Sequence, residues 1–400
     1  MELVAEKYKQ TEVGLIPSDW GVKPLGEIAF VNMGQSPLST YYNSQGIGLP
    51  LVQGNADVEN RKTIIRFYTS MITKRGKIGD IIMSVRAPVG EVSKATFECC
   101  LGRGVCSISF DNEYIYQYLI FFEKSWGKLS TGSTFDSVNS KQVKELQIPL
   151  PLAKSEQTAI ASALSDADAL ISSLEKLIAK KRNIKQGAMQ KLLQPKEGWD
   201  LLPLKKVVWF QEGPGVRNYQ FTKSGVKLLN GTNIEKGNLL LDKTERFISE
   251  QEAFGWYSHF LADDGDIIIA CSGVTINKFD EKVTFVKKEH LPLCMNTSTM
   301  RFKIISDNLD KNYFFHFLKS DSFKEQIGGK ATGSAQLNFG PSHVQNVEIS
   351  FPIKSEQNEI ATILSDMDNE IAALEKKLSK SKMLKQGMMQ ELLTGKIRLI

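Results

Sequence analysis

The sequence predicts an α+β protein in which two globular domains are separated by two long antiparallel coiled-coil helices, with an internal pseudo-twofold repeat. Two observations lead to this prediction. Residues 154–157 (Lys-Ser-Glu-Gln) recur 200 residues later at 354–357, and 22 of the 40 residues from 154 to 193 are identical in the second copy. Shorter markers also recur, such as Gly-Asp-Ile-Ile at 79–82 and 265–268. An internal repeat of this length constrains the architecture before any local assignment.

The markers divide the chain into four segments. A chain of 400 residues exceeds what one hydrophobic core usually organises, so at least two domains are expected. We expect a first globular domain at 1–150, a first helix at 151–195, a second globular domain at 196–352 and a second helix at 353–400. Short β-rich runs bounded by Gly, Asn and Asp fill each globular domain. One helical stretch is expected in each, at Tyr114–Phe122 and at Asn312–Leu318.

The repeated segment has the heptad pattern of a coiled-coil helix. Apolar residues follow one another in steps of four and three in both copies. In the second copy they are Ile360, Leu364, Met367, Ile371, Leu374 and Leu378. In the first copy they are Ile160, Leu164, Ala167, Ile171, Leu174 and Ile178, and the stripe then continues to Ile184, Ala188 and Leu192. Ser155 and Ser355 are expected to cap the two N-termini, and Pro195 and Gly395 to end the helices.

The apolar seam of each helix needs a partner. A helix of 39 residues is about 58 Å long, and the other copy can supply the matching seam, with Ala163 and Ala167 opposing Ile363 and Met367. Antiparallel packing is favoured because a parallel pair would require the second domain to return the chain over the whole length of the helix. Periodicity alone is equally compatible with a coiled-coil stalk that joins two copies of the chain.

Composition limits the possible functions. The chain has 42% hydrophobic residues and a net charge of +5, a mild excess that permits a polyanionic partner. It contains no apolar run of about 20 residues and no signal-peptide core at its start, so we expect a cytoplasmic protein. The five cysteines show no CxxC spacing, which predicts reduced, buried thiols and no structural zinc. All four histidines lie in the second half.

Four segments resemble a known family. They are TEVGLIPSDW at 11–20, IPLPLAKSEQTAIASALSDAD at 148–168, its echo ISFPIKSEQNEIATILSDMD at 349–368, and KQGMMQELLTGKIRL at 385–399. Over its whole length the chain resembles the specificity (S) subunit of type I restriction-modification systems. The resemblance implies that the globular domains are target recognition domains, each of which reads one half of a split double-stranded DNA sequence. It also implies that the helices set the gap between the half-sites and dock two methyltransferase subunits, with restriction subunits joining through the complex.

The residues themselves offer no catalytic site. The chain has no GxxxxGK[ST] motif for nucleotide phosphates and no Asp/Asn-Pro-Pro-aromatic motif for amino-methyl transfer. Residues 263–266 (Asp-Asp-Gly-Asp) form the densest acidic cluster, but the aligned residues 77–80 (Lys-Ile-Gly-Asp) lack two of the acids. We therefore interpret the cluster as a solvated turn. The expectation is a non-catalytic subunit without a cofactor or metal.

Candidate DNA-binding residues lie in loops beside the repeated glycine markers. Reading of DNA requires cations for phosphates and polar side chains for the edges of the bases. The candidates in the first domain are Gln35, Ser36, Asn55, Arg86, Ser133 and Thr134. Those in the second are Arg217, Asn230, Asn233, Ser272, Asn296 and Gln336. The aligned Thr-Gly-Ser elements at 131–133 and 332–334 are favoured, since the residues after them differ, as two different half-sites would require.

Two alternatives remain open at this level. The basic helix residues either form a solvated face or line the DNA between the half-sites with salt-sensitive attraction. They are Lys176, Lys180, Lys181, Arg182, Lys185, Lys376, Lys377, Lys380, Lys382 and Lys385. The alternative function is a coiled-coil assembly protein whose globular domains bind protein or glycan ligands without DNA.

Overall fold

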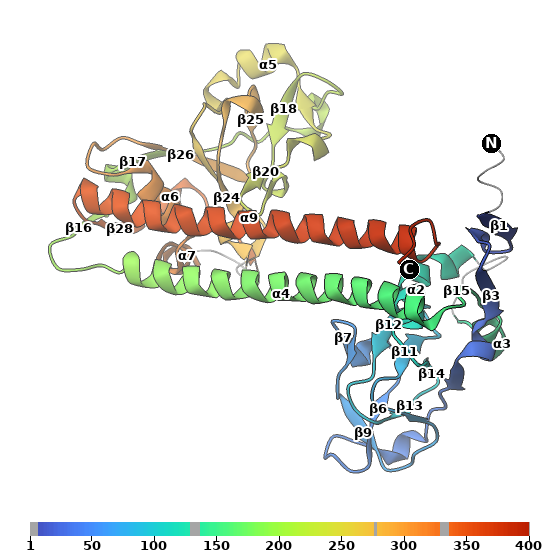
Figure 1. The fold of residues 1–400 in the computed structure, drawn as a ribbon. Coiled ribbons are helices and arrows are strands. Elements are labelled where there is room, and N and C mark those ends of the chain that lie inside the picture. Colours follow the sequence, from blue (N-terminus) through green and yellow to red (C-terminus); the bar gives the residue numbers. More distant parts are fainter. Residues whose placement is uncertain (1–6, 129–136, 276–277, 329–335, 400) are drawn as a thin grey trace. The chain divides into compact units, whose positions relative to one another are not determined.

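The computed structural model describes residues 7–128, 137–275, 278–328 and 336–399 (Figure 1). The chain forms two compact units, one made of residues 1–176 and 375–400 and the other of residues 177–374. These units do not coincide with the two halves of the sequence repeat. Each unit combines one globular part with segments of both long helices, because the helices run antiparallel and each contributes one end to each unit.

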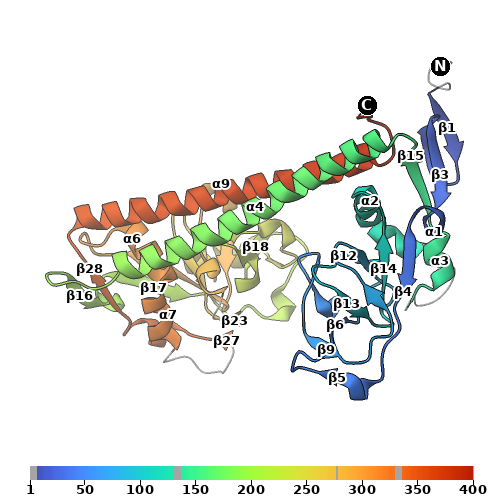
Figure 2. The same ribbon diagram turned by 60° about the horizontal axis from the view of Figure 1, so that its bottom comes forward.

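The two long helices are α4 (Lys154–Leu192) and α9 (Lys354–Leu392), each of 39 residues. In the first unit, the Lys385 ammonium lies 2.6 Å from a carboxylate oxygen of Asp168. In the second unit, Lys185 forms the corresponding ion pair with Asp368. The two contacts are related by a shift of 200 residues, and in both the start of one helix meets the end of the other. The prediction of an antiparallel helix pair with pseudo-twofold symmetry is therefore confirmed (Figures 1 and 2).

The helix seam differs from the prediction in two places. Ile160, Leu164, Leu174 and Ile178 are buried as expected, but Ile184 is 47% exposed, and the buried positions after Ile178 are Lys185, Met189 and Leu193. The predicted opposition of Ala163 and Ala167 to Ile363 and Met367 is also wrong. Equivalent positions of the two copies face each other only in a parallel pair, whereas the antiparallel arrangement places them in different units.

The starts of the helices correct another prediction. Ser155 and Ser355 are the second residues of α4 and α9, so they lie inside the first turn and do not cap it. Instead, the buried amides of Gln157 and Gln357 donate hydrogen bonds to the carbonyl oxygens of Pro151, at 2.8 Å, and Pro352, at 2.7 Å. Gln157 thus ties the first turn of α4 to the end of the preceding strand, and Gln357 ties the first turn of α9 to the residue just after the preceding strand.

The globular part of the first unit contains two main sheets. The larger has the order β4-β14-β11-β12-β8-β7 and the smaller the order β10-β13-β6-β9-β5. The strands of the larger sheet are Phe30–Met33, Val105–Ser109, Ile81–Ser84, Val92–Lys94, Lys62–Thr63 and Val58–Glu59. Those of the smaller sheet are Arg75–Gly76, Cys99–Leu101, Leu49–Val52, Phe67–Thr69 and Tyr42–Asn43. A hairpin of β1 (Tyr8–Thr11) and β2 (Gly14–Pro17) precedes them.

The globular part of the second unit is built on the same plan. A sheet of order β17-β26-β22-β24 comprises Val208–Glu212, Thr299–Ile304, Ile267–Ala270 and Val283–Phe285. A smaller sheet of order β21-β18-β25 comprises Phe247–Ile248, Val226–Leu229 and Leu293–Met295. Two short pairs accompany them, β19 (Ile234–Glu235) with β20 (Asn238–Leu239) and β23 (Val274–Thr275) with β27 (Gln336–Leu337). Helix α5 spans Glu250–Phe254, and α7 spans Asp321–Gly328.

Matching contacts join each globular part to the strand that leads into a long helix. The predicted helical stretches are confirmed as α2 (Tyr114–Phe122) and α6 (Lys311–Lys319). The Tyr114 hydroxyl donates to the Pro149 carbonyl at 2.8 Å, and the Tyr313 hydroxyl donates to the Ser350 carbonyl at the same distance. These carbonyls belong to β15 (Gln147–Pro151) and β28 (Glu348–Phe351), which lead directly into α4 and α9 and pair with β3 (Trp20–Pro24) and β16 (Asp200–Pro203).

The repeated glycine markers are explained by close backbone approach. A Cβ atom on Gly34 would lie 2.1 Å from the Gly102 carbonyl oxygen, and one on Gly213 would lie 2.4 Å from the Asn296 carbonyl oxygen. The loops after β4 and β17 therefore lie against neighbouring backbone at equivalent points in the two units. Short 3-10 turns and the small helices α1 (Leu25–Ile28), α3 (Ser140–Lys144) and α8 (Pro341–Val344) complete the described structure.

The cysteines behave as predicted. All five are buried and free of disulfide bonds. Burial raises the pKa of the Cys106 and Cys271 thiols to about 12, so both are neutral at physiological pH. Within the described part of the chain, no helix is both long enough and apolar enough to cross a membrane.

Candidate nucleic-acid interface

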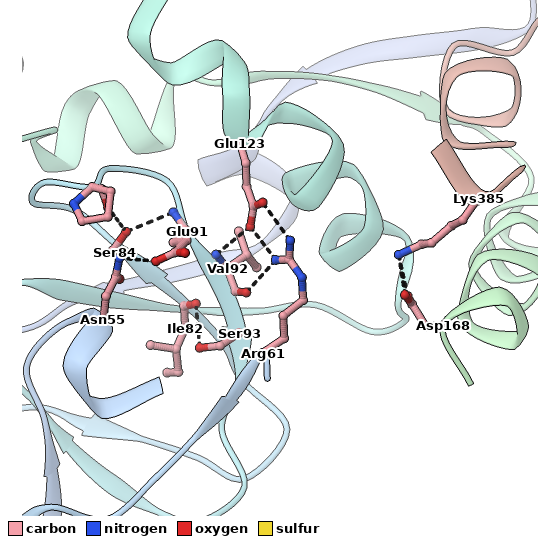
Figure 3. A network of polar contacts seen from close by, with 11 residues as sticks. Asn55, Arg61, Ile82, Ser84, Glu91, Val92, Ser93, Glu123, Asp168 and Lys385 are labelled. Atoms are coloured by element: carbon pink, nitrogen blue, oxygen red, sulfur yellow. Dashed lines mark hydrogen bonds and ion pairs between the residues drawn. The ribbon is translucent and has the colours of Figure 1, made fainter. Parts of the chain in front are cut away.

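In the first unit, two of the candidate DNA-binding residues, Asn55 and Arg86, lie on neighbouring loops that are tied together. The Asn55 amide donates to the Glu91 carboxylate (Figure 3). The loop that carries Arg86 and Glu91 is closed by Ser84, whose hydroxyl donates to the Pro88 carbonyl at 2.6 Å and accepts from the Glu91 amide at 3.0 Å. The Arg86 side chain is exposed. The half-buried Asn55 and the exposed Arg86 are thus held on one framework.

A neighbouring ion pair that sequence analysis missed fixes this framework. The Arg61 guanidinium donates to both carboxylate oxygens of Glu123, at 2.6 and 2.9 Å, and to the Val92 carbonyl at 3.0 Å (Figure 3). The Val92 amide donates back to Glu123 at 2.9 Å. The hydrogen bond from Arg61 to Glu123 raises the pKa of the Arg61 guanidinium. A bidentate pair of this kind is geometrically specific, so it locks the β7–β8 hairpin onto β12 and the segment after α2.

The other candidates of the first unit have different positions. Gln35 follows Gly34 with an exposed side chain, while its backbone amide donates to the Leu101 carbonyl at 2.9 Å. The Ser36 hydroxyl accepts a hydrogen bond from the Arg103 backbone amide at 3.1 Å, so it joins the loop after β4 to the loop after β13. Ser133 and Thr134 lie outside the described residues, as does the second Thr-Gly-Ser element at 332–334.

In the second unit, the structure brings Ser272 and Gln336 together. Thr275 of β23 pairs with Gln336 of β27, and the Ser272 hydroxyl donates to the Asn338 side-chain oxygen at 3.1 Å. Both Ser272 and Gln336 are exposed. Arg217 is also exposed, but it lies apart from them in the chain, at the start of the short turn η6 (Asn218–Gln220). These three side chains are accessible to a ligand.

The three asparagines among the candidates of the second unit form an internal network. The Asn296 amide donates to the Asn230 side-chain oxygen at 2.9 Å, and the Asn233 amide donates to the Thr244 hydroxyl at 2.8 Å. The Asn233 side-chain oxygen accepts from the Asn230 backbone amide at 2.9 Å. Asn233 and Asn296 are each only 7% exposed. Their amides are already hydrogen-bonded, so they hold the loops around β18 and β25 in place and present little polar surface to a ligand.

The helix pair contains two polar clusters at equivalent positions, in each of which a buried lysine meets a partly exposed aspartate. In the first unit, Asp168 contacts Lys385 and accepts from the Gln117 amide at 3.1 Å. In the second unit, Asp368 contacts Lys185 and also the Lys319 ammonium at 3.4 Å. Burial, and then the neighbouring ammonium of Lys185, lower the pKa of Lys319. Lys185 and Lys385 thus serve the helix pair and are removed from the set of candidate DNA-contacting cations.

Other helix cations remain accessible. Lys181 and Lys382 form interhelical ion pairs, with Glu370 at 2.7 Å and with Glu175 at 2.7 Å. By contrast, Lys176, Lys180, Lys376, Lys377 and Lys380 are exposed. Arg182 and Lys382 are exposed as well, and all of these exposed residues keep both of the interpretations that the sequence allowed, a solvated face or a contact with DNA.

The acidic cluster at 263–266 lines a cavity of about 430 Å³, together with Lys303 and Lys311. Asp266 accepts from the Asp263 backbone amide at 2.9 Å and forms an ion pair with Arg301 at 3.3 Å. Gly265 in this turn has a φ of +81°, and Gly79 in the corresponding turn of the first unit has +85°. No group of three potential metal ligands occurs among the described residues. The cluster is a structured turn before β22, held by arginine and lysine.

Comparison with known proteins identifies the family. The model of the type I restriction modification DNA specificity domain matches the chain twice, at residues 17–186 and 196–381. The chain belongs to this family. Each match contains one globular part and most of the long helix that follows it. The sequence repeat is therefore a tandem pair of specificity domains.

Individual relatives agree with this assignment. A type I restriction enzyme MjaVIII specificity subunit of Methanocaldococcus jannaschii is 26% identical over 98% of this chain and 96% of its own. A putative MjaX specificity subunit from the same organism is 38% identical, over 42% of this chain and 40% of that protein. The crystal structure of an S subunit from M. genitalium matches with a TM-score of 0.60 at 16% identity, over 97% of this chain and 98% of that one. The predicted fold and family are confirmed.

Proposed function

We propose that this chain is the non-catalytic DNA-recognition subunit of a type I restriction-modification complex, and that its two globular domains read two halves of one split target. The observation that carries the proposal is the double match to a DNA specificity domain. The two domains share their framework but present different side chains, Asn55 and Arg86 in one and Ser272 and Gln336 in the other. Different polar groups on the same framework read different bases.

The proposal extends to partners and to the geometry of the target. Methyltransferase subunits dock on the long helices, restriction subunits join through the complex, and the gap between half-sites follows from the length of α4 and α9. A fixed connection makes the second half-site contact effectively intramolecular, so two weak interactions give one specific one. The domain boundaries at 1–150, 151–195, 196–352 and 353–400 are part of this proposal.

Sequencing of methylated adenines in cells that express this chain with its methyltransferase subunit tests the recognition roles. Asn55→Ala combined with Arg86→Ala should relax bases in one half-site only, and Ser272→Ala combined with Gln336→Ala should relax bases in the other. Lys62→Ala, an exposed change on β8, serves as the control and should leave the target unchanged.

If both pairs of variants alter the same half-site, the assignment of one domain to each half-site is wrong. If no sequence-specific methylation occurs and no sequence-selective gel shift is seen, the chain is an assembly protein for other ligands.

A matched insertion tests the role of the helices. An insertion in α4 alone would displace either Asp168 from Lys385 or Asp368 from Lys185, because these contacts flank the middle of the pair. Seven residues inserted in both helices, after Lys176 and after Leu374, keep the heptad seam and both ion pairs. They lengthen each helix by about 10 Å, close to the rise of three base pairs. We expect a target gap longer by about three base pairs with unchanged half-sites; altered half-sites with an unchanged gap would contradict the proposal.

A further inference from the structure

Two aromatic side chains of the second unit are almost fully exposed. Trp256 is 86% exposed and Tyr219 is 85% exposed. Neither ring takes part in an aromatic pair or a hydrogen bond within the described part of the chain. Large aromatic rings gain much free energy from burial, so two rings held in solvent on folded backbone indicate a binding surface.

The backbone that carries these rings is rigidly joined. Tyr219 lies in η6, and Trp256 follows helix α5. The Gln220 amide donates to the Glu252 carboxylate at 2.9 Å and lies 3.0 Å from the Tyr257 hydroxyl. Each exposed ring is therefore next in the chain to a residue of this cross-link. Figure 1 shows α5 on the small sheet β21-β18-β25, well away from α9. The backbone that carries the rings is held in place before any ligand arrives, which reduces the entropy cost of binding.

The charge around Tyr219 suits a polyanion. Residues 215–227 contain Arg217, Lys223 and Lys227 and no carboxylate, while helix α5 contributes Glu250 and Glu252, the second of which is hydrogen-bonded to Gln220. Arg217, two residues before Tyr219, is exposed. Exposed rings beside cations are the chemistry that binds nucleic acid through its bases and phosphates, because every base has a face that stacks on an aromatic ring. An apolar protein partner would use the rings but not the cations.

Among the described residues, no aromatic ring of the first unit is as exposed as Trp256 and Tyr219. Between β9 and β11 of the first unit the chain has residues 70–80, whereas between β21 and β22 of the second unit it has residues 249–266, seven more. The additional length includes α5 and Trp256. Any effect of the exposed rings should therefore be confined to one half-site.

We propose that Tyr219 and Trp256 form an aromatic wedge, which stacks against opened bases in the half-site read by the second domain, while Arg217 binds an adjacent phosphate. The proposal rests on the DNA-recognition function proposed above. Stacked B-DNA has no space for a ring between its bases, so the wedge must open a base step. Opening bends the duplex and favours sequences that unstack easily, such as pyrimidine–purine steps. The wedge thus adds specificity without a hydrogen bond to a base.

A 2-aminopurine scan of the target duplex tests the wedge. The chain is used in complex with its methyltransferase subunits, and the probe is placed at each position except the adenine that is methylated, because a flipped base gives its own signal. Fluorescence should rise in the half-site of the second domain at the base of the opened step that has lost its neighbour without stacking on a ring, since a ring stacked on the probe would quench it. Trp256→Ala should abolish this rise and weaken binding roughly tenfold, and Trp256→Phe should retain most of both. Phe30→Ala, a change of a 69% exposed ring in the first unit, is the matched control and should affect neither.

Other outcomes would contradict the proposed aromatic wedge. If Trp256→Ala and Tyr219→Ala bind the target and give the wild-type fluorescence pattern, the rings do not act on DNA. If Trp256→Ala instead weakens the complex with the methyltransferase subunits in the absence of DNA, the surface is a protein contact. The wild-type gel shift separates this inference from the proposed function. Selective binding without a fluorescence rise refutes only the wedge, whereas absence of selective binding refutes both.

Discussion

At the scale of single residues, the two carboxylates of the helix pair occupy equivalent positions but contact different numbers of ammonium groups. Asp168 pairs with one ammonium, that of Lys385, and with a neutral amide. Asp368 lies between two ammonium groups, Lys185 and Lys319, whose side chains are 11% and 10% exposed. Removal of one partner from a buried ion pair leaves the other charge uncompensated, which costs more than the pair itself contributes.

We therefore expect Asp368→Ala to destabilise the protein more than Asp168→Ala does. The loss for Asp368→Ala should be about 3–5 kcal/mol, because two buried like charges would remain. Asp366→Ala, an exposed carboxylate two residues away, is the control and should change stability by less than about 0.5 kcal/mol. Urea unfolding followed by circular dichroism measures the differences. Equal losses for the two aspartates would contradict this account of the clusters.

Asp368 should also give the protein an acid-sensitive contribution to stability. Burial alone would raise the pKa of Asp368, but the ammonium groups of Lys319 and Lys185 outweigh it and lower the pKa below its ordinary value of 3.8. A carboxyl with a lower pKa in the folded state stabilises above its unfolded pKa, and this stabilisation is lost as pH falls through the folded value. Wild type should therefore lose stability below about pH 4, and Asp368→Asn should lose less over the same range. Parallel pH curves for the two proteins would contradict this.

At the scale of elements, the regular parts of the fold were predictable and the contacts between distant segments were not. Heptad spacing located both long helices, and the recurring glycines located equivalent turns in the two domains. The exposed Ile184 and the buried Lys185 reversed the expected pattern, because the seam follows the partner helix and the ion pair with Asp368. The Arg61–Glu123 pair joins residues 62 positions apart, and nothing in the local sequence indicates it.

The candidate site was predictable only in part, for the same reason. Residue type and nearness to a glycine marker selected Asn55, which is half-buried, and Arg86, Ser272 and Gln336, which are exposed. The same criteria selected Asn233 and Asn296, whose burial depends on hydrogen bonds formed in the tertiary structure. The exposed Trp256 was missed because an aromatic residue in a sequence is normally assigned to a core.

Glycines in different elements should respond to alanine in opposite ways. Gly187 and Gly387 lie inside α4 and α9, and a Cβ atom there would meet nothing within 4 Å. Alanine at either position should raise the free energy of unfolding by about 0.5–1 kcal/mol, because glycine is the weaker helix former. Gly34→Ala and Gly213→Ala should instead destabilise by more than about 2 kcal/mol, since the new atom would overlap a backbone carbonyl. Thermal unfolding checks the signs, and a loss of stability from Gly187→Ala would contradict the argument.

At the scale of the whole molecule, the exposed helix lysines decide between two modes of DNA binding. If they contact the DNA between the half-sites, replacement of Lys176, Lys180, Lys376 and Lys380 by Gln should reduce the dependence of affinity on salt. The slope of log affinity against log salt should fall by up to about 0.9 for each phosphate that the protein no longer neutralises. We favour the alternative of a solvated face, which predicts an unchanged slope. Binding titrations of the complex on its target at several salt concentrations distinguish the two, and a lowered slope would contradict our choice.

During synthesis the first unit is completed later than the second, because its two parts flank the second unit in the sequence. The core of the first unit includes Met389, Leu392 and Leu393, which are synthesised after the whole of the second unit. The second unit is one continuous stretch, so all of it emerges before those residues do. The domain made first must wait for the last turns of α9 before its apolar surface is covered. It is therefore the part of the nascent protein most exposed to chaperones.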